Sequence, residues 1–528
     1  MNVASLLDRQ AAERPDAPAL SVVAGRSGGR IQLDTLSFGQ LRERMDGYAR
    51  GFSALGLGRG DRVSVFLKPG HDFVAVTFAL FKIGCSPVFV DPGMGRSRAL
   101  DCVKRMAPRG LVALPLLHLV RPLFASSFAT VEHHVSTGGW SWGASRLSAL
   151  WEPGEPVEPL PMDPDEEAAI LFTSGSTGPP KGVVTTHRIL VGQTERIAEL
   201  YGLGPGDVDV PGLPVFAFFS VAMGMHVAFP EIDPTKPASL DPSKVVGLID
   251  QVEATSVFGS PALLRPIAAW CEGQGRGLPT LKRALSAGCE VPVSLHRRFR
   301  ALLPAGAEIH TPYGATEALP VASISTSQVL SETGARSLAG EGTCVGALAP
   351  GIELRIVRIT EHDLPEWGAV EILPQGEIGE ICVTGACVTR RYEQEPAANA
   401  AHKIADGERV WHRMGDVGYL DEQGRLWYCG RKSHRVVLDD QTLFTVPVEG
   451  VFNGQAGVAR TALVQAAGSA VLVVEKDGEV DTDALLALAA ARGLPIETVL
   501  FHPRFPVDVR HNAKIHRLEL AAWAEGRL

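Results

Sequence analysis

The chain has 528 residues, of which 45% are hydrophobic and 21% are charged, and its formal net charge is −9. This composition is typical of a soluble globular protein rather than a disordered one, and an acidic chain lacks the basic surface that general nucleic-acid binding requires. The length predicts several domain-sized units. No run is long and apolar enough to predict a membrane span, since Lys82 and Pro115 interrupt the nearest two.

The cysteines and the N-terminus both indicate a cytoplasmic enzyme. Eight cysteines are scattered without a Cys-x-x-Cys pair, which favours reduced thiols over a zinc or redox motif. Residues 1–15 include Asp8 and Glu13 and lack the apolar core of a signal peptide. The apolar stretch 111–124 is best explained by core packing, although contact with a lipid surface or an apolar substrate stays open.

Helix and strand patterns alternate over residues 1–110, which predicts a layered α/β fold. Apolar spacing predicts helices over 38–55 and 73–83, with strands over 61–67 and 87–90. From 126 to 164 the chain is rich in Gly, Ser, Pro and Trp and has little periodicity. We expect a long surface excursion there.

A run of hydroxyls and glycines closed by a lysine follows this excursion and predicts a polyphosphate site. Its members are Thr173, Ser174, Gly175, Ser176, Thr177, Gly178, Lys181 and Gly182. Glycines let successive N–H groups converge on an anion, and the lysine adds a mobile positive charge. A flexible linker shares this composition but does not explain a lysine between two apolar segments, and the order Lys181-Gly182 excludes the usual P-loop.

The middle of the chain continues the alternation, with helices predicted over 188–200 and 244–253 and strands over 256–259 and 284–287. Residues 213–219 are dense in aromatic side chains, with Met223 and Met225 close behind. Such a run can line an acyl pocket. We interpret it as core, because runs of this kind are usually buried.

A second cluster spans residues 311–317 and offers groups that suit a nucleotide. The Tyr313 ring beside the open backbone of Gly314 suits stacking on a base, Thr316 supplies a hydroxyl, and Glu317 supplies an oxygen ligand for Mg²⁺. Taken alone, the cluster is equally well explained as an ordinary turn.

A third cluster contains Asp416, whose carboxylate can bind both hydroxyls of a ribose, and Arg431. Residues 421–424 between them predict a hairpin turn. After Arg431 the pattern indicates a compact α+β unit of about one hundred residues. Its expected elements are a helix starting at 447, paired strands over 460–465 and 470–476, a helix over 483–492, a strand over 499–501, and a polar tail that contains Lys514.

In this order and spacing, the three clusters and Lys514 resemble the adenylate-forming superfamily of acyl-CoA ligases, adenylation domains and luciferase-like enzymes, over nearly the whole chain. The resemblance implies an α/β fold with a large N-terminal domain over residues 1–431. It also implies a small mobile α+β C-terminal domain over residues 432–528, with a hinge near Ser433. It further implies activation of a carboxylic acid by ATP with Mg²⁺.

The resemblance also assigns roles to the motif residues. Lys181 and the loop hydroxyls would hold the β- and γ-phosphates, while Tyr313 would stack on adenine with the Gly288 region on the other side. Thr316 would contact the α-phosphate and Glu317 would hold magnesium. Asp416 and Arg431 would bind the ribose, and Lys514 would bridge the carboxylate and the α-phosphate. Such positive groups are needed because a carboxylate and a triphosphate repel each other.

Four departures from the superfamily pattern concern the delivery of a thiol and the last motif. Ser433 stands at the hinge, Asp440 where a glycine opens a pantetheine passage, Ala217 at the position that often gates this passage, and Asn512-Ala513 where Ser-Gly is usual. Three of the four would affect thioester formation. Adenylation machinery is therefore expected, whereas thioesterification is in doubt.

With Tyr313–Pro320 and His511–Ile515, the chain is similar to the β-lactone synthetases of bacterial long-chain olefin biosynthesis. This implies a long-chain 2-alkyl-3-hydroxy acid as substrate, whose own hydroxyl displaces AMP, and other enzymes of the olefin pathway as partners. Two alternatives stay open. One is a long-chain acyl-CoA ligase with unusual hinge residues. The other is a non-catalytic nucleotide-binding scaffold, which has no use for Lys514.

Overall fold

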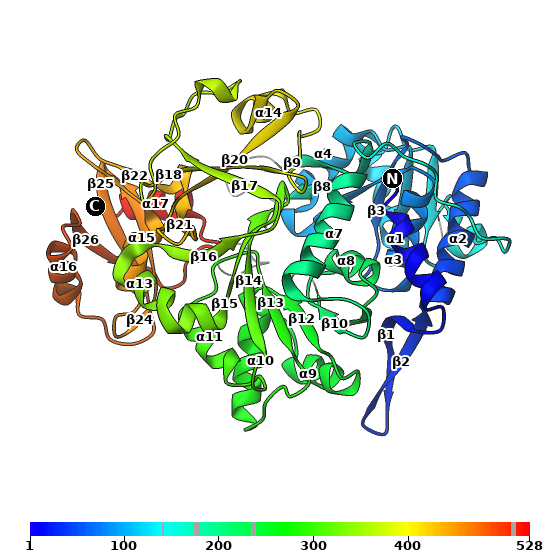
Figure 1. Ribbon diagram of the computed structural model, residues 1–528, viewed down its shortest axis with the longest axis horizontal. Coiled ribbons are helices and arrows are strands. Elements are labelled where there is room, and N and C mark those ends of the chain that lie inside the picture. The colour runs from blue at the N-terminus through cyan, green and yellow to red at the C-terminus, as the bar shows by residue number, and fades with distance from the viewer. Residues whose placement is uncertain (140–141, 174–179, 234–235, 237–238, 508–513) are drawn as a thin grey trace.

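The computed structural model covers residues 1–528 and describes all of them except 140–141, 174–179, 234–235, 237–238 and 508–513 (Figure 1). Two large sheets contain most of the strands, and a three-stranded sheet forms after residue 432. The N-terminus lies in the part of the molecule built on the seven-stranded sheet, and the C-terminus lies beyond the three-stranded sheet at the opposite end.

The seven-stranded sheet has the order β7-β6-β5-β3-β4-β8-β9. Its neighbours are parallel except for the antiparallel pair β8–β9. In that pair Thr173 lies opposite Lys181, so the two ends of the predicted phosphate loop are adjacent. The strands are β3 (Arg62–Phe66), β4 (Ser86–Val90), β5 (Gly110–Ala113), β6 (His133–Ser136), β7 (Ser145–Arg146), β8 (Glu167–Thr173) and β9 (Lys181–Thr186).

Two of these strands lie inside the stretch expected to be a surface excursion. Within 126–164 the chain forms β6, β7 and the short helix α6 (Leu147–Leu150), so that expectation was wrong for the first half of the stretch. The strands have four and two residues. Segments this short are too brief to show an alternating pattern in the sequence.

The fourteen-stranded sheet runs in the order β17-β18-β20-β21-β16-β15-β14-β13-β12-β10-β11-β1-β2, with β19 paired to β20. Its central pairs from β1–β11 to β13–β14 are parallel, whereas the pairs from β14–β15 onward are antiparallel.

The strands of this sheet are β1 (Pro18–Ser27), β2 (Arg30–Ser37), β10 (Val208–Pro211), β11 (His226–Phe229), β12 (Ser256–Gly259), β13 (Arg283–Ser286), β14 (Glu308–Ala315), β15 (Ala318–Ser325), β16 (Thr343–Leu348), β17 (Ile352–Val357), β18 (Gly379–Gly385), β19 (Lys403–Asp406), β20 (Arg409–Leu420) and β21 (Leu426–Arg431). Parallel neighbours bring their carboxyl ends to one edge, where α/β proteins usually bind ligands.

Helices surround these sheets. They are α1 (Ala4–Glu13), α2 (Phe38–Ala54), α3 (His71–Lys82), α4 (Arg96–Met106), α5 (Pro115–Val120), α7 (His187–Tyr201), α8 (Phe216–Ala222), α9 (Pro242–Gln251), α10 (Pro261–Gly273), α11 (Val293–Arg300), α12 (Thr326–Gln328), α13 (Gly334–Arg336) and α14 (Pro396–His402). The helices predicted from apolar spacing all form, with ends within about two residues of those expected.

Helix α3 is apolar on every side because it is buried on nearly every side. All its residues except Asp72 are buried, since it packs between α1, α2 and the sheet. Its last residue, Lys82, is buried as well, and its ammonium lies 2.8 Å from Asp8 Oδ1 of α1 and 2.5 Å from Asp46 Oδ1 of α2. The two carboxylates compensate the cost of burying this charge.

After residue 432 the chain forms the hairpin β22 (Val436–Val437) and β23 (Thr442–Leu443), helix α15 (Thr445–Phe452), strands β24 (Val458–Ala466), β25 (Ser469–Lys476) and β26 (Ile496–Phe501), and helices α16 (Thr482–Ala491) and α17 (Arg517–Glu525). β24 and β25 are antiparallel, as expected, and β26 adds in parallel. A separate apolar core around Phe452 and Leu472 stabilises this part.

Candidate active site

A cavity of about 1820 Å³ brings together residues that are far apart in the chain. It lies between the two large sheets and the part that follows residue 432. Nine of the predicted site residues line it: Lys181, Gly288, Tyr313, Gly314, Thr316, Glu317, Asp416, Arg431 and Lys514. Ser174, Gly175, Ser176, Thr177 and Gly178 lie outside the described residues, while the backbone of Thr173 ends β8.

The carboxylate of Asp416 is held from two sides. The hydroxyl of Tyr313 on β14 donates a 2.6 Å hydrogen bond to Oδ2, and Nη1 of Arg431 lies 3.1 Å from Oδ1. Asp416 and Arg431 are directly opposite on β20 and β21, so the register of these strands fixes the pair. Tyr313 and Asp416, about one hundred positions apart in the chain, thus belong to one hydrogen-bonded group with Arg431.

Asp416 also has an unused hydrogen-bond acceptor. Its Oδ1 is buried and has no hydrogen-bond donor among the described residues, despite the nearby charge of Arg431. Burial raises the pKa of Asp416, while Arg431, the Tyr313 hydroxyl and Lys514 oppose that rise. A buried acceptor without a donor is costly, and a sugar hydroxyl would satisfy it. The pair therefore fits the ribose of a nucleotide.

Two glycines leave room beside Tyr313. Gly288 follows β13 with φ of +93°, a conformation that L side chains rarely adopt. A Cβ at Gly314 would come within 2.5 Å of the Ala318 carbonyl oxygen, so the tight turn after β14 excludes a side chain there. Since β13 and β14 are parallel neighbours, both glycines lie at the carboxyl-end edge of the sheet.

Thr316 and Glu317 form the turn of the hairpin between β14 and β15. The hydroxyl of Tyr392 donates a 2.8 Å hydrogen bond to Glu317 Oε1, and the backbone carbonyl of Glu317 accepts from Thr389 N at 2.7 Å. Within the described part of the chain, no three His, Cys, Asp or Glu side chains lie close enough to hold a metal ion on their own. A lone carboxylate suits Mg²⁺, which usually takes its other ligands from phosphates and water.

Lys181 lies beside a histidine that the sequence analysis missed. Its Nζ is 3.0 Å from Nε2 of His402, whose Nδ1 lies 3.3 Å from the Arg413 carbonyl. Burial lowers the pKa of His402 to about 4 and also lowers that of Lys181, which Glu317 partly counteracts. The next residue, Lys403, donates to Thr389 O, and burial lowers its pKa to about 7.

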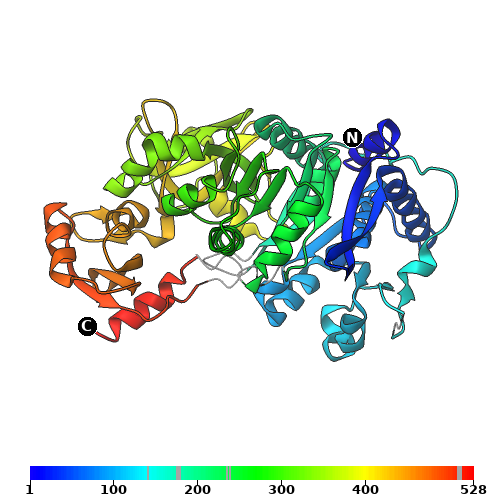
Figure 2. The same cartoon turned by 90° about the horizontal axis from the view of Figure 1, so that it is seen from below.

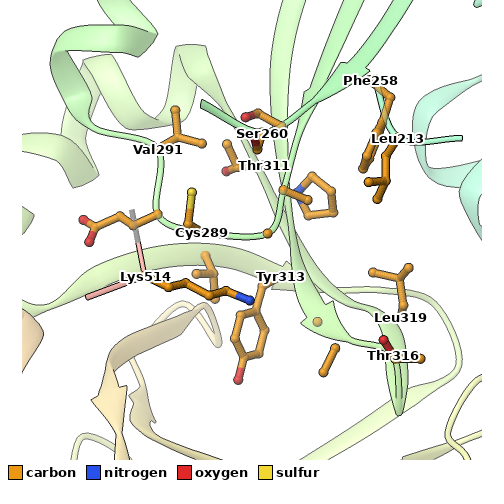
Figure 3. Close-up of a pocket in the computed structure, with 18 of the residues that line it drawn as sticks. Leu213, Phe258, Ser260, Cys289, Val291, Thr311, Tyr313, Thr316, Leu319 and Lys514 are labelled. Carbon is orange, nitrogen blue, oxygen red and sulfur yellow. The ribbon is translucent and has the colours of Figure 1, made fainter. Parts of the chain in front are cut away.

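Lys514 reaches the cavity from the far end of the chain. Figure 3 shows its side chain extending toward Tyr313 beside Cys289, with Thr316 farther along the cavity. Its ammonium is close enough to Asp416 to lower the pKa of that carboxyl. A positive charge thus lies near the position that the Tyr313–Asp416 pair marks for the nucleoside.

One arm of the cavity is apolar, and Leu213, Phe216, Phe218 and Phe219 help to line it. The interpretation of residues 213–219 as simple core was therefore wrong for these four. Phe218 is central, with ring centroids 4.7 Å from Phe73 and 5.6 Å from Phe89, which line the same arm. Ala217 in the same helix is fully buried in the core. That it replaces a gating side chain stays a prediction.

A hydrogen bond and an ion pair flank the expected hinge at Ser433. Lys432 Nζ donates to the Thr360 carbonyl at 3.0 Å, and Arg435 pairs with Glu361. Asp440 is exposed in the turn between β22 and β23. Its expected obstruction of a thiol passage stays a prediction.

Tyr392, His402 and Lys403 could not be recognised from the sequence. They follow β18 in a stretch without a motif, and they meet Lys181 and Glu317 only through the fold. The Arg391-Tyr392 segment lies along β9, as the bridge between Val183 and Tyr392 shows.

Comparison with known proteins finds several that this chain resembles. The sequence pattern of the family described as "AMP-binding enzyme" matches residues 7–393. An "Olefin beta-lactone synthetase" of Stenotrophomonas maltophilia is 44% identical, with 100% of this chain and 98% of that protein aligned. Another of the same name, from Xanthomonas campestris, is 43% identical over 99% of this chain and 97% of that protein.

Two solved structures share the fold. One is the amide bond synthetase McbA of Marinactinospora thermotolerans, with a TM-score of 0.81, 22% identity and 99% of both chains covered. The other is the O-succinylbenzoate Coenzyme A synthetase MenE of Bacillus subtilis in complex with AMP, with a TM-score of 0.77, 21% identity, and 98% of this chain and 97% of that chain covered. At these identities the likeness confirms the expected α/β fold of the adenylate-forming type and nothing beyond it.

Proposed function

The chain belongs to the AMP-binding enzyme family, and from this premise we propose that it joins ATP to a long-chain 2-alkyl-3-hydroxy acid and closes the acyl adenylate to a β-lactone. Adenylate-forming β-lactone synthesis in olefin biosynthesis is the activity that the full-length likeness to the two synthetases indicates. The single structural observation that carries the proposal is the convergence of Lys514, Tyr313 and Asp416 on one cavity with an apolar arm.

In the proposed first step, a carboxylate oxygen of the acid attacks the α-phosphorus of ATP, and the bond to pyrophosphate breaks. Asp416 holds the ribose, Tyr313 stacks on the base, and Thr316 contacts the α-phosphate. Lys181, kept in place by His402, binds the departing phosphates, while Lys514 neutralises charge between carboxylate and phosphate. Mg²⁺ held by Glu317 would supply further positive charge to the phosphates when bound.

In the second step, the 3-hydroxyl oxygen of the substrate attacks its own carbonyl carbon. The bond from that carbon to the AMP oxygen breaks, the hydroxyl proton passes to water, and a four-membered ring closes as AMP departs. The nucleophile is already tethered to the carbonyl, which supplies the proximity that a second substrate would otherwise have to gain by binding. The aromatic arm around Phe218 would hold an alkyl chain.

We further propose that residues 432–528 act as the small mobile domain, with the hinge near Ser433. Its own apolar core around Phe452 and Leu472 supports this assignment, because a part that moves as a body needs its own packing. A cytoplasmic location and contact with other enzymes of the olefin pathway stay predictions. None of the eight cysteines, all of which the structure describes, forms a disulfide, which suits a reducing compartment.

The deciding experiment incubates the protein with ATP, Mg²⁺ and a 2-alkyl-3-hydroxy acid, with and without coenzyme A. A matched 2-alkyl acid that lacks the 3-hydroxyl serves as control. We expect AMP, pyrophosphate and a product one water lighter than the hydroxy acid without coenzyme A, detected by mass spectrometry. Two results together would instead assign the chain to the acyl-CoA ligases. These are stoichiometric acyl-CoA when coenzyme A is present, and no dehydrated product when coenzyme A is left out.

A further inference from the structure

An apolar patch lies on the exposed side of α5 and of the 3₁₀ segment that follows it, η2 (Arg121–Ser127). Leu116, Leu119 and Leu123 are 69%, 46% and 78% exposed, and Trp142 nearby is 54% exposed. We call these four residues the α5 patch. Large apolar side chains grouped on a surface usually mark a contact with another molecule or a membrane.

The opposite side of α5 is fixed to the protein, so the leucines are not exposed by fraying of the helix. Leu117 packs against the apolar core, and His118 is fully buried with Nε2 2.9 Å from the Val135 carbonyl. Leu116 and Leu119 are three positions apart and share one face of the helix. The segment therefore presents a fixed amphipathic surface.

Exposed arginines lie near the α5 patch. Residues 91–128 contain six Lys and Arg against two Asp, a net charge of +4 in a chain of net charge −9, although Arg105 pairs with Glu395 and Arg109 with Asp61 and Glu132. Arg96 and Arg98 are exposed on α4, which packs against η2. The Arg96 guanidinium lies 5.6 Å from the centre of the Phe124 ring. Asp91 and Asp101 are the two opposing charges of this segment.

The α5 patch lies close in the chain to residues that line the active-site cavity. Leu114, the residue that caps α5, lines the cavity together with Phe66, the last residue of β3, and Leu67, which follows it. In Figure 2, α4 and the light-blue to cyan segment that follows it lie at the lower edge of the molecule. The surface and the cavity are thus connected by a few residues of continuous chain.

We propose that the α5 patch docks on a bilayer of anionic phospholipids. The three leucines and Trp142 would enter the boundary between headgroups and acyl chains, and Arg96 and Arg98 would contact the phosphates. No helix in the described part of the chain is long and apolar enough to cross a membrane, so the contact is peripheral. A substrate with two alkyl chains partitions into lipid, and docking there would bring it to the apolar arm. That last consequence rests on the proposed function, whereas the docking does not.

The test measures sedimentation of the full chain with vesicles of phosphatidylethanolamine and phosphatidylglycerol, and with vesicles of phosphatidylcholine alone. We expect binding to the anionic vesicles, weakened by salt. Leu116→Gln, Leu119→Gln and Leu123→Gln combined should reduce the bound fraction at least about tenfold, since each leucine contributes several buried CH₂ groups. Arg96→Glu with Arg98→Glu should weaken binding about fivefold or more per position at low salt.

Leu330→Gln with Leu518→Gln is the matched control, because both are exposed leucines remote from α5. It should bind vesicles as the unaltered protein does. Absence of binding to anionic vesicles, or equal loss in the control, overturns the proposal. A pathway enzyme that binds through the α5 patch while vesicles do not would equally overturn it in favour of a protein partner.

Failure of docking and failure of the proposed function give different results. Adenylation of a short, water-soluble 3-hydroxy acid should be unchanged in the triple leucine variant, because the α5 patch does not touch the reacting groups. Turnover of a long-chain substrate presented in vesicles should fall with binding. Loss of the short-chain activity as well would contradict the separation of docking surface and active site.

Discussion

The ammonium of Lys181 lies 3.0 Å from Nε2 of His402, and Nδ1 of the same ring lies 3.3 Å from the Arg413 carbonyl. With Nδ1–H donating to that carbonyl, Nε2 is left to accept from the lysine. The lowered pKa of His402 keeps the ring neutral at physiological pH, as this arrangement requires. His402 thus acts as a positioning residue for Lys181.

His402→Ala should therefore impair use of ATP more than folding. A hydrogen bond to a charged group contributes about 1.5–3 kcal/mol, so we expect KM for ATP to rise about tenfold or more, with a smaller change in kcat. Pyrophosphate exchange at varied ATP measures both. His226→Gln, a half-buried histidine bonded to Ser21 away from the cavity, is the control. An unchanged KM for ATP would show that Lys181 does not depend on His402.

Lys514→Ala should abolish adenylate formation and leave nucleotide binding nearly intact, because Tyr313, Asp416 and Lys181 all precede residue 432. Removal of one charge-stabilising group typically costs about 2.7–4 kcal/mol, a hundredfold to a thousandfold in rate. Single-turnover formation of acyl-AMP and titration with ATP separate the two effects. Lys476→Ala, an exposed lysine of the same part, should behave as the unaltered protein. Near-normal turnover of Lys514→Ala would defeat the assignment.

Tyr313→Phe separates the proposed stacking of the ring on the base from the hydrogen bond that the Tyr313 hydroxyl donates to Asp416. The ring remains while the 2.6 Å hydrogen bond to Asp416 is lost, so we expect a modest loss of nucleotide affinity, about three- to tenfold. Asp416→Ala should cost more, since it removes the ribose contact itself. Calorimetric titration with AMP ranks the variants. Equal affinities of both variants would mean that the hydroxyl has no separate role.

Phe218→Ala should shift substrate preference toward longer or bulkier chains. The ring is half-buried at the centre of the aromatic group with Phe73 and Phe89, and its removal enlarges the apolar arm. One or two methylene groups are worth about 1–3 kcal/mol in such a pocket. Competition between substrates of different chain length measures the shift. A lower rate with the same length profile would place the alkyl chain elsewhere in the cavity.

Stability should fall as the pH falls from about 6.5 to about 4. Burial lowers the pKa of both His187 and His296 to about 4, so within this window the unfolded chain binds more protons than the folded one. The free energy of unfolding then rises with pH, by up to about 3 kcal/mol per group. Thermal melts from pH 4.5 to 7.5 give the slope. His296→Gln should flatten it, whereas His362→Gln at an exposed site should not.

The sequence predicted the parts of the site that carry local motifs. Tyr313, Asp416 and Lys514 were assigned from their motifs, and the structure places them around one cavity, while their individual roles await the experiments above. Periodic helices such as α7 were also predicted closely. Both kinds of feature depend on residues close together in the chain.

Features created by tertiary packing could not be predicted. Tyr392 contacts Glu317, and His402 contacts Lys181. Both residues reach the site only because the segment after β18 lies along β9. Phe218 was assigned to core because apolar spacing over a helix of seven residues does not distinguish packing from the wall of a cavity. The joining of β16 to β21 in one sheet likewise depends on residues some eighty positions apart.

The apolar arm of the cavity affects whether water or the substrate's own hydroxyl attacks the activated carbonyl. An activated acyl group is open to attack by solvent as well as by its own hydroxyl, and solvent is present at far higher concentration. Rings such as Phe216 and Phe218 offer water no hydrogen bonds, so a chain that fills the arm dries the space around the carbonyl. Closure of the strained ring can then be faster than hydrolysis. The same side chains that select the substrate also shield its acyl adenylate from water.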